Sequence, residues 1–126
     1  MNWASLAALN LTLAVITGAF GAHALKVRLA AEQLAWWHTA VEYHFIHALG
    51  LLAIGVLVRS WPLSASPVPA GLGSSALWLQ IGILIFSGSL YAMALGAPRW
   101  FGAITPLGGL ALIAGWLWLA WTLARN

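Results

Sequence analysis

The amino-terminal part of the chain contains an apolar run that limits which class of fold is available. Residues 3–25 hold no charged side chain. A helix of this length, at 1.5 Å per residue, measures about 35 Å and can cross a hydrocarbon core of roughly 30 Å. A cleavable signal peptide is the rival interpretation, but no cation precedes the run, which also exceeds the apolar part of such peptides. The sequence therefore predicts a first membrane-spanning helix here.

The composition extends this prediction to the whole chain. Of its 126 residues, 63% are hydrophobic and only 6% are charged, whereas about a quarter is charged in soluble domains. The nine tryptophans lie mostly near the ends of apolar runs, as they do at membrane interfaces. Five scattered Lys and Arg give no basic patch, and the absence of cysteine removes thiolate chemistry. We expect a lipid bilayer as the main partner and no nucleic acid.

The second span needs polar residues to reach its length. Residues 45–58 are uncharged but too few to cross, so the span must begin near His38 and take polar side chains into the membrane. The chain is thus predicted to be an all-α integral membrane protein of one domain, residues 1–126. The expected spans are residues 3–25, 38–58, 74–96 and 104–124, with a Pro- and Gly-containing linker over 59–73.

A weak internal repeat relates the two halves. Thr17-Gly18 matches Ser87-Gly88 at an offset of 70, and Gly55 matches Gly115 at an offset of 60. Two helical hairpins in the same orientation would account for this pattern, and chance similarity between Ala-, Leu- and Gly-rich helices is the alternative. Lys and Arg are balanced between the two sides, so charge alone does not orient the protein.

Small residues recur at helical spacing in the first and fourth spans, which is typical of helix packing in membranes. The predicted packing positions are Asn10, Ala14, Thr17, Gly18, Gly21, Gly108, Ala111 and Gly115. The third span carries Gln80, Leu84, Ser87 and Tyr91 on one face.

Polar residues gather near the first and third loops, which lie on one side of the membrane because successive spans alternate in direction. The set comprises His23, His38, Glu42, Tyr43, His44, His47, Ser87, Ser89, Tyr91, Arg99 and Thr105. Their common depth predicts a polar vestibule that opens toward this side.

Glu42 is the central residue of this set, since a carboxylate inside a span should be paired, protonated or hydrated. Lys26, Arg99 and His38 are its candidate partners. An interfacial ion pair that fixes the helices is one interpretation, and a proton or ion relay is another.

Other site chemistries have weaker signals. His44 and His47 are three residues apart, as two metal ligands can be, with His23 a conceivable third, but no Asp or Cys motif lies nearby. Ser87 lies within a predicted helix rather than on the sharp turn that exposes a nucleophile. We therefore expect no metal, no cofactor and no enzymatic activity.

Four motifs in order resemble the YgdD/YwdK-like family of small bacterial inner-membrane proteins, a domain of unknown function with a eukaryotic transmembrane relative. They are residues 18–25 (GAFGAHAL), 37–44 (WHTAVEYH), 86–91 (FSGSLY) and 105–109 (TPLGG). The resemblance covers nearly the whole chain and implies four spans without an established activity. It also implies that Gln commonly replaces His44, and that both termini are cytoplasmic.

These observations favour a non-enzymatic, oligomeric or accessory component of the inner membrane. Its polar vestibule would bind a small ligand, a lipid headgroup or a partner, and the partner would be a second copy or another membrane protein. A small proton- or ion-coupled transporter that uses Glu42 and the histidines is one alternative, and a haem- or metal-binding membrane protein is the other.

Overall fold

Four long helices make up the protein. The structure is a computed structural model and describes residues 1–62 and 66–126. The elements are α1 (Trp3–Ala22), α2 (Ala31–Ser60), α3 (Ala70–Ala94), a short 3₁₀ helix η1 (Arg99–Ala103) and α4 (Thr105–Arg125). Each long helix has the length and apolar composition to cross a membrane, and the described ranges contain no strand. The prediction of an all-α protein with four membrane-spanning helices is confirmed.

The helices differ from the expected spans at their ends. α2 begins at Ala31 rather than near His38, so the tryptophan pair Trp36 and Trp37 lies inside it. α3 begins at Ala70, which leaves residues 61–69 between the helices instead of 59–73, and residues 63–65 of the expected linker lie outside the described residues. The difference arises because hydropathy reports the solvent around a segment, whereas helical hydrogen bonding continues beyond the hydrocarbon region.

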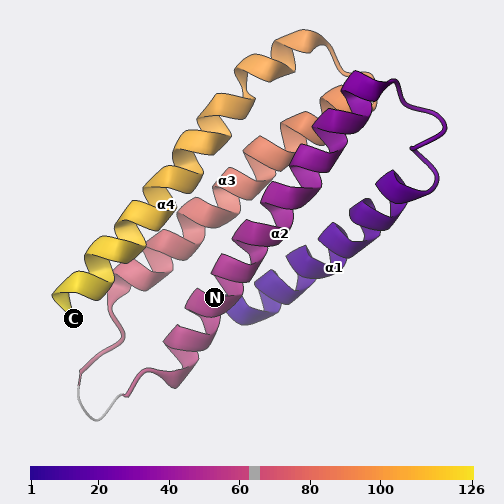
Figure 1. Cartoon of the computed structure of the whole chain (residues 1–126). Helices are drawn as coiled ribbons and strands as arrows, with labels where there is room; N and C mark the ends of the chain where they lie inside the picture. Colours follow the sequence, from indigo (N-terminus) through magenta and orange to yellow (C-terminus); the bar gives the residue numbers. More distant parts are fainter. Residues whose placement is uncertain (63–65) are drawn as a thin grey trace.

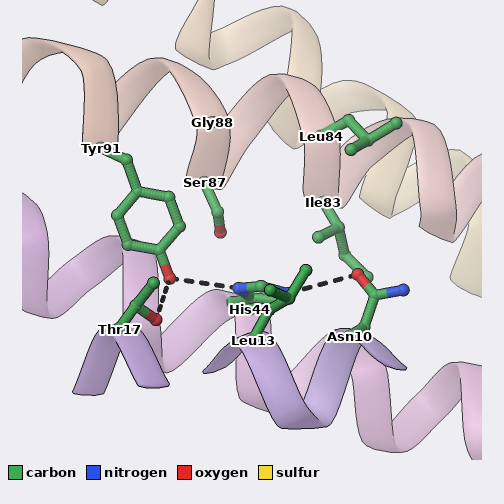
Figure 2. A pocket seen from close by; sticks show the side chains of 9 residues that line it. All are labelled: Asn10, Leu13, Thr17, His44, Ile83, Leu84, Ser87, Gly88 and Tyr91. Carbon is green, nitrogen blue, oxygen red and sulfur yellow. Dashed lines mark hydrogen bonds between the residues drawn. The ribbon is translucent and has the colours of Figure 1, made fainter. Parts of the chain in front are cut away.

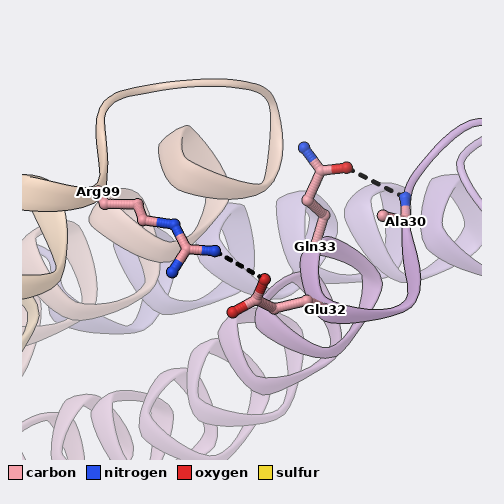
Figure 3. A network of polar contacts seen from close by, with 4 residues as sticks. All are labelled: Ala30, Glu32, Gln33 and Arg99. Atoms are coloured by element: carbon pink, nitrogen blue, oxygen red, sulfur yellow. Dashed lines mark hydrogen bonds and ion pairs between the residues drawn. The ribbon is translucent and has the colours of Figure 1, made fainter.

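Local hydrogen bonds account for several of these ends. The Asn2 side chain accepts a hydrogen bond from the Ser5 N–H at 3.2 Å and so caps α1. The Gln33 side chain accepts one from the Ala30 N–H at 3.0 Å at the start of α2 (Figure 3). At the end of α3, Gly96 has a φ of 109° and donates its N–H to the Met93 carbonyl, the glycine-terminated arrangement that closes many helices.

The helices lie side by side in chain order (Figure 1). α1 packs along α2, α2 along α3, and α3 along α4, without extensive backbone contact between α1 and α3. Because successive helices alternate in direction, α1 and α3 run the same way along the two flanks of α2. This arrangement leaves space between α1 and α3.

Apolar side chains and glycines hold the four helices together. Leu51, Ile54, Leu79 and Leu112 belong to the buried cluster between α2, α3 and α4. Glycine at position 108 allows α4 to approach the backbone of α3 closely, since a Cβ there would overlap the main chain of Phe86.

Candidate functional site

A cleft with a volume of about 260 Å³ lies between α1 and α3, with α2 as its floor. Its lining comes from all three helices (Figure 2): Asn10, Leu13, Thr17, His44, Ile83, Leu84, Ser87, Gly88 and Tyr91. The polar members of this lining are the candidate site.

A chain of hydrogen bonds runs along the cleft (Figure 2). His44 Nδ1 lies 3.1 Å from the Tyr91 hydroxyl, which lies 2.9 Å from the Thr17 hydroxyl. On the other side of the ring, His44 Nε2 lies 3.3 Å from Asn10 Oδ1, and Asn10 Nδ2 donates to Gln80 Oε1 at 2.8 Å. These hydrogen bonds connect α1, α2 and α3, so the side chains bridge the space that the α1 and α3 backbones leave open.

The directions of these bonds define the form of the histidine. Asn10 Oδ1 can only accept, so His44 Nε2 carries a proton, and in the neutral ring Nδ1 is then an acceptor. Nδ1 then accepts from the Tyr91 hydroxyl. Both ring nitrogens of His44 are therefore engaged within the protein, and the ring holds Asn10 and Tyr91 in place along the cleft.

The spacing of residues on each helix explains why they converge. Asn10 and Thr17 are seven residues apart on α1, and therefore lie on one face of that helix. Ser87 and Tyr91, four residues apart on α3, share a face in the same way. His44 is the residue of α2 that points between these two faces (Figure 2).

The cleft opens sideways, between the two outer helices. Its rim includes Leu13 and Leu84, whose side chains are 46% and 65% exposed. Toward the first loop, the buried Trp37 donates its indole N–H to the Thr17 carbonyl at 2.8 Å and packs on the Tyr91 ring. A bulky side chain therefore lies between the cleft and the loops, and the site differs from the expected vestibule on that side.

Eight of the eleven residues of the expected polar set do not line the cleft. Glu42, His38 and His23 are exposed on the outer surface. Glu42 follows His38 by one turn on the same face of α2. Within the described parts of the chain, no hydrogen bond or ion pair to the Glu42 carboxylate is formed.

Arg99, a candidate partner of Glu42, binds a different carboxylate. Its guanidinium donates to Glu32 at 2.9 Å (Figure 3) and lies 5.8 Å from the centre of the Trp36 ring. The pair joins the start of α2 to η1. Both side chains are largely exposed, so this contact contributes at most about 1 kcal/mol.

The remaining members of the set form small local contacts. Tyr43 stacks on both His47 and Phe86, and His47 Nδ1 bonds to the Tyr43 carbonyl at 2.7 Å. The Ser89 and Thr105 hydroxyls are 2.6 Å apart and link α3 to α4. Each of these contacts lies outside the cleft.

The histidines do not converge on a common point. His44 faces the cleft, whereas His47 packs against Tyr43 and faces Trp116 of α4. Throughout the described ranges, no three His, Asp or Glu side chains are placed to hold one metal ion.

The expected packing residues fall into two groups. Asn10 and Thr17 belong to the hydrogen-bonded chain of the cleft, and Gly18 lies beside Val41. The other five lie at close helix contacts: Ala14, Gly21, Gly108, Ala111 and Gly115.

The sequence analysis predicted Asn10 as a packing residue and Gln80 as part of one face of the third span, and included neither in the expected vestibule. Both are amides near the middle of helices that run in the same direction. Since a polar side chain in a membrane seeks a partner on a neighbouring helix, their common depth was the signal that could have paired them. The apolar lining residues Leu13 and Ile83 gave no such signal, because Leu and Ile occur on every face of these helices.

Comparison with known proteins places the sequence in a family. The family described as "Protein of unknown function (DUF423)" matches residues 17–109. The chain belongs to this family. A UPF0382 membrane protein of Staphylococcus saprophyticus is 47% identical over 90% of this chain and 89% of its own length. No solved structure matches.

Two further relatives are named as membrane proteins, and one of them as an inner membrane protein. The UPF0382 membrane protein YwdK of Bacillus subtilis is 44% identical over 89% of this chain and 87% of its own length. The UPF0382 inner membrane protein YgdD of Escherichia coli is 34% identical over 87% of this chain and 79% of its own length. The predicted family is thereby confirmed, and the chain is a multi-pass inner-membrane protein of this UPF0382 family.

Proposed function

We propose that this UPF0382 protein is a non-enzymatic binding component of the inner membrane, whose cleft takes the polar group of a lipid-soluble small molecule. The observation that supports this proposal is the combination of an apolar, laterally open rim with a hydrogen-bonding floor. Leu13 and Leu84 would contact the apolar part of such a molecule. The Tyr91 hydroxyl oxygen and Asn10 Oδ1, each of which can accept one more hydrogen bond, would accept from its polar group.

The position of the cleft across the membrane favours a lipid-soluble small molecule over a phospholipid headgroup. Asn10 and Thr17 lie on either side of the middle of α1, so the polar floor lies near the centre of the membrane. A headgroup lies about 15 Å from that plane, at the edge of the hydrocarbon core. A hydroxyl or amide N–H carried on an apolar molecule can reach the floor through the side opening and donate to it.

The volume also limits the ligand. About 260 Å³ is slightly less than the smallest common pockets for drug-sized molecules, which begin at roughly 300 Å³. The cleft therefore holds one ring or a short branched group, with the rest of the molecule outside among the lipid chains.

The surroundings of the hydroxyl groups support binding rather than catalysis. Ser87 Oγ donates to the Ala40 carbonyl at 2.8 Å and is not activated by His44. Tyr91 is engaged by both Thr17 and His44. Groups held in this way orient a ligand without acting as nucleophiles.

The test is retention of a ligand during purification from native membranes. Solvent extraction and mass spectrometry should find a lipid-soluble molecule with a hydrogen-bonding group, near one per chain. Gly88→Leu should abolish retention, because Gly88 lines the cleft and nothing lies within 4 Å of the position of its Cβ, so the added side chain occupies the cleft without a clash.

Gly73→Leu is the matched control, since Gly73 is also in α3 but does not line the cleft. It should retain the molecule as the wild type does. A folded wild-type protein without a bound molecule, or equal retention in the Gly88 and Gly73 variants, would contradict the proposal.

A further inference from the structure

The outward face of α2 carries a row of exposed residues that no other part of the described chain covers. We call it the outer stripe; it consists of Ala35, His38, Glu42, Ile46, Leu49, Ala53 and Val56. The intervals of three and four residues are those of a helix that packs along a second helix. The outer stripe thus has the geometry of a helix-packing face.

The outer stripe lies opposite the cleft. Glu42 and His44 are two residues apart, and at 100° per residue they point about 200° apart around the helix. Since His44 forms the floor of the cleft, Glu42 faces away from it. The outer stripe and the cleft are therefore separate surfaces of the protein.

Glu42 lies well inside the membrane. Trp37 bonds to the carbonyl of Thr17, five residues before the end of α1, and Glu42 is five residues, or about 7.5 Å, further along α2. An exposed carboxylate at this depth would face lipid chains, which is unfavourable. Something other than lipid is expected to cover it.

We propose that the protein forms a two-fold symmetric homodimer through the outer stripe, in which Glu42 of each copy pairs with His38 of the partner subunit. Copies inserted in the same orientation are related by an axis along the membrane normal, so residues of equal depth meet. Because His38 is only one turn from Glu42, the Glu42 carboxylate of each copy reaches the His38 imidazole of the other copy. The two-fold symmetry therefore gives two such pairs.

A second copy is the occupant that the charges favour. The outer stripe contains both an acid and a base, so it is complementary to itself. The five Lys and Arg lie outside the middle of the spans, and Arg99 is already paired with Glu32. Ala35 and Ala53 are small enough to let two α2 helices approach closely.

Disulfide crosslinking in native membranes tests this proposal, and the chain suits it because it contains no cysteine. Leu49→Cys should give a disulfide-linked dimer on mild oxidation. Leu110→Cys is the matched control on α4, since Leu110 is 62% exposed and Leu49 is 53% exposed. A yield for Leu49→Cys no greater than for Leu110→Cys would overturn the proposal, as would a crosslink to a different protein.

The pairing is tested in the Leu49→Cys background. Glu42→Leu and His38→Leu should each weaken dimerisation about three- to tenfold, the range expected for a polar contact between helices in a membrane. The exchange of both residues, His38→Glu with Glu42→His, should restore the yield because it keeps the reciprocal pair. An unchanged yield in the single variants, or no restoration in the exchange, would overturn the pairing.

Discussion

At the scale of single residues, two neighbours on α2 meet opposite surroundings. His44 is buried and bonded on both ring nitrogens, whereas Glu42 is exposed. Both were expected in one vestibule because they share a depth. Depth follows from position along a helix, but the direction of a side chain depends on its angle around the helix, and two residues of separation reverse it.

Substitutions of His44 should separate hydrogen bonding from ring chemistry. His44→Gln keeps a donor and an acceptor, so we expect it to retain the bound molecule within a factor of about five of the wild type. His44→Leu has neither and should lower retention further, by about tenfold. Extraction and mass spectrometry measure both values. Equal retention in the two variants would show that hydrogen bonding by the side chain at position 44 does not contribute to binding.

The contact between Tyr91 and Thr17 should be measurable as a coupling energy. Tyr91→Phe removes a hydroxyl that contacts both Thr17 and His44, and should destabilise the protein by about 0.6 to 1.7 kcal/mol. Thr17→Val should destabilise the protein less, because the Tyr91 hydroxyl keeps its hydrogen bond to His44. The double variant should lose less unfolding free energy than the two single variants lose together, as measured by unfolding in mixed micelles. Strict additivity would rule out a direct contact.

At the scale of helices, glycines set the distance between α3 and α4. A Cβ at position 108 would overlap the Phe86 backbone, but a Cβ at 109 would meet only the Phe86 ring, at 3.8 Å. The two adjacent glycines are thus a natural pair for comparison. The sequence alone could not distinguish them, because both belong to one small-residue run.

Gly108→Ala should destabilise the bundle by about 1 to 3 kcal/mol, since the backbones must separate. Gly109→Ala should be neutral or stabilise it by up to about 1 kcal/mol, through the higher helix propensity of Ala. Thermal unfolding in detergent gives both values. Similar losses in the two variants would mean that α4 packs on α3 in another register.

The number and order of the helices were predictable from the sequence, whereas their packing was not. Apolar length defined three of the four spans, and the second was extended over the polar residues before its apolar run, because a membrane imposes that length on any helix that crosses it. The contact between Asn10 and Gln80, 70 residues apart in the chain, depends on which faces α1 and α3 turn toward each other. Those faces are selected by packing on α2.

At the scale of the whole molecule, four alternating spans place the termini together. Ser66 and Asn126 should therefore lie on one side of the membrane, and Val27 and Ala97 on the other. Single cysteines at these positions, labelled in intact cells with an impermeant maleimide, test this arrangement. We propose that the side of the termini is cytoplasmic, so only the cysteines at 27 and 97 should react. Labelling of the cysteines at 66 and 126 alone would show the opposite orientation.

The side-by-side order of the helices has a consequence for access to the cleft. α2 and α3 each have a helix on both flanks, whereas α1 packs extensively only on α2 and reaches α3 through side chains. α1 is therefore the wall that can move outward with the loss of the fewest contacts, and its displacement would widen the cleft along its full length. Passage of a molecule between bilayer and cleft would then depend on sideways motion of one helix rather than on the opening of a loop at the membrane surface.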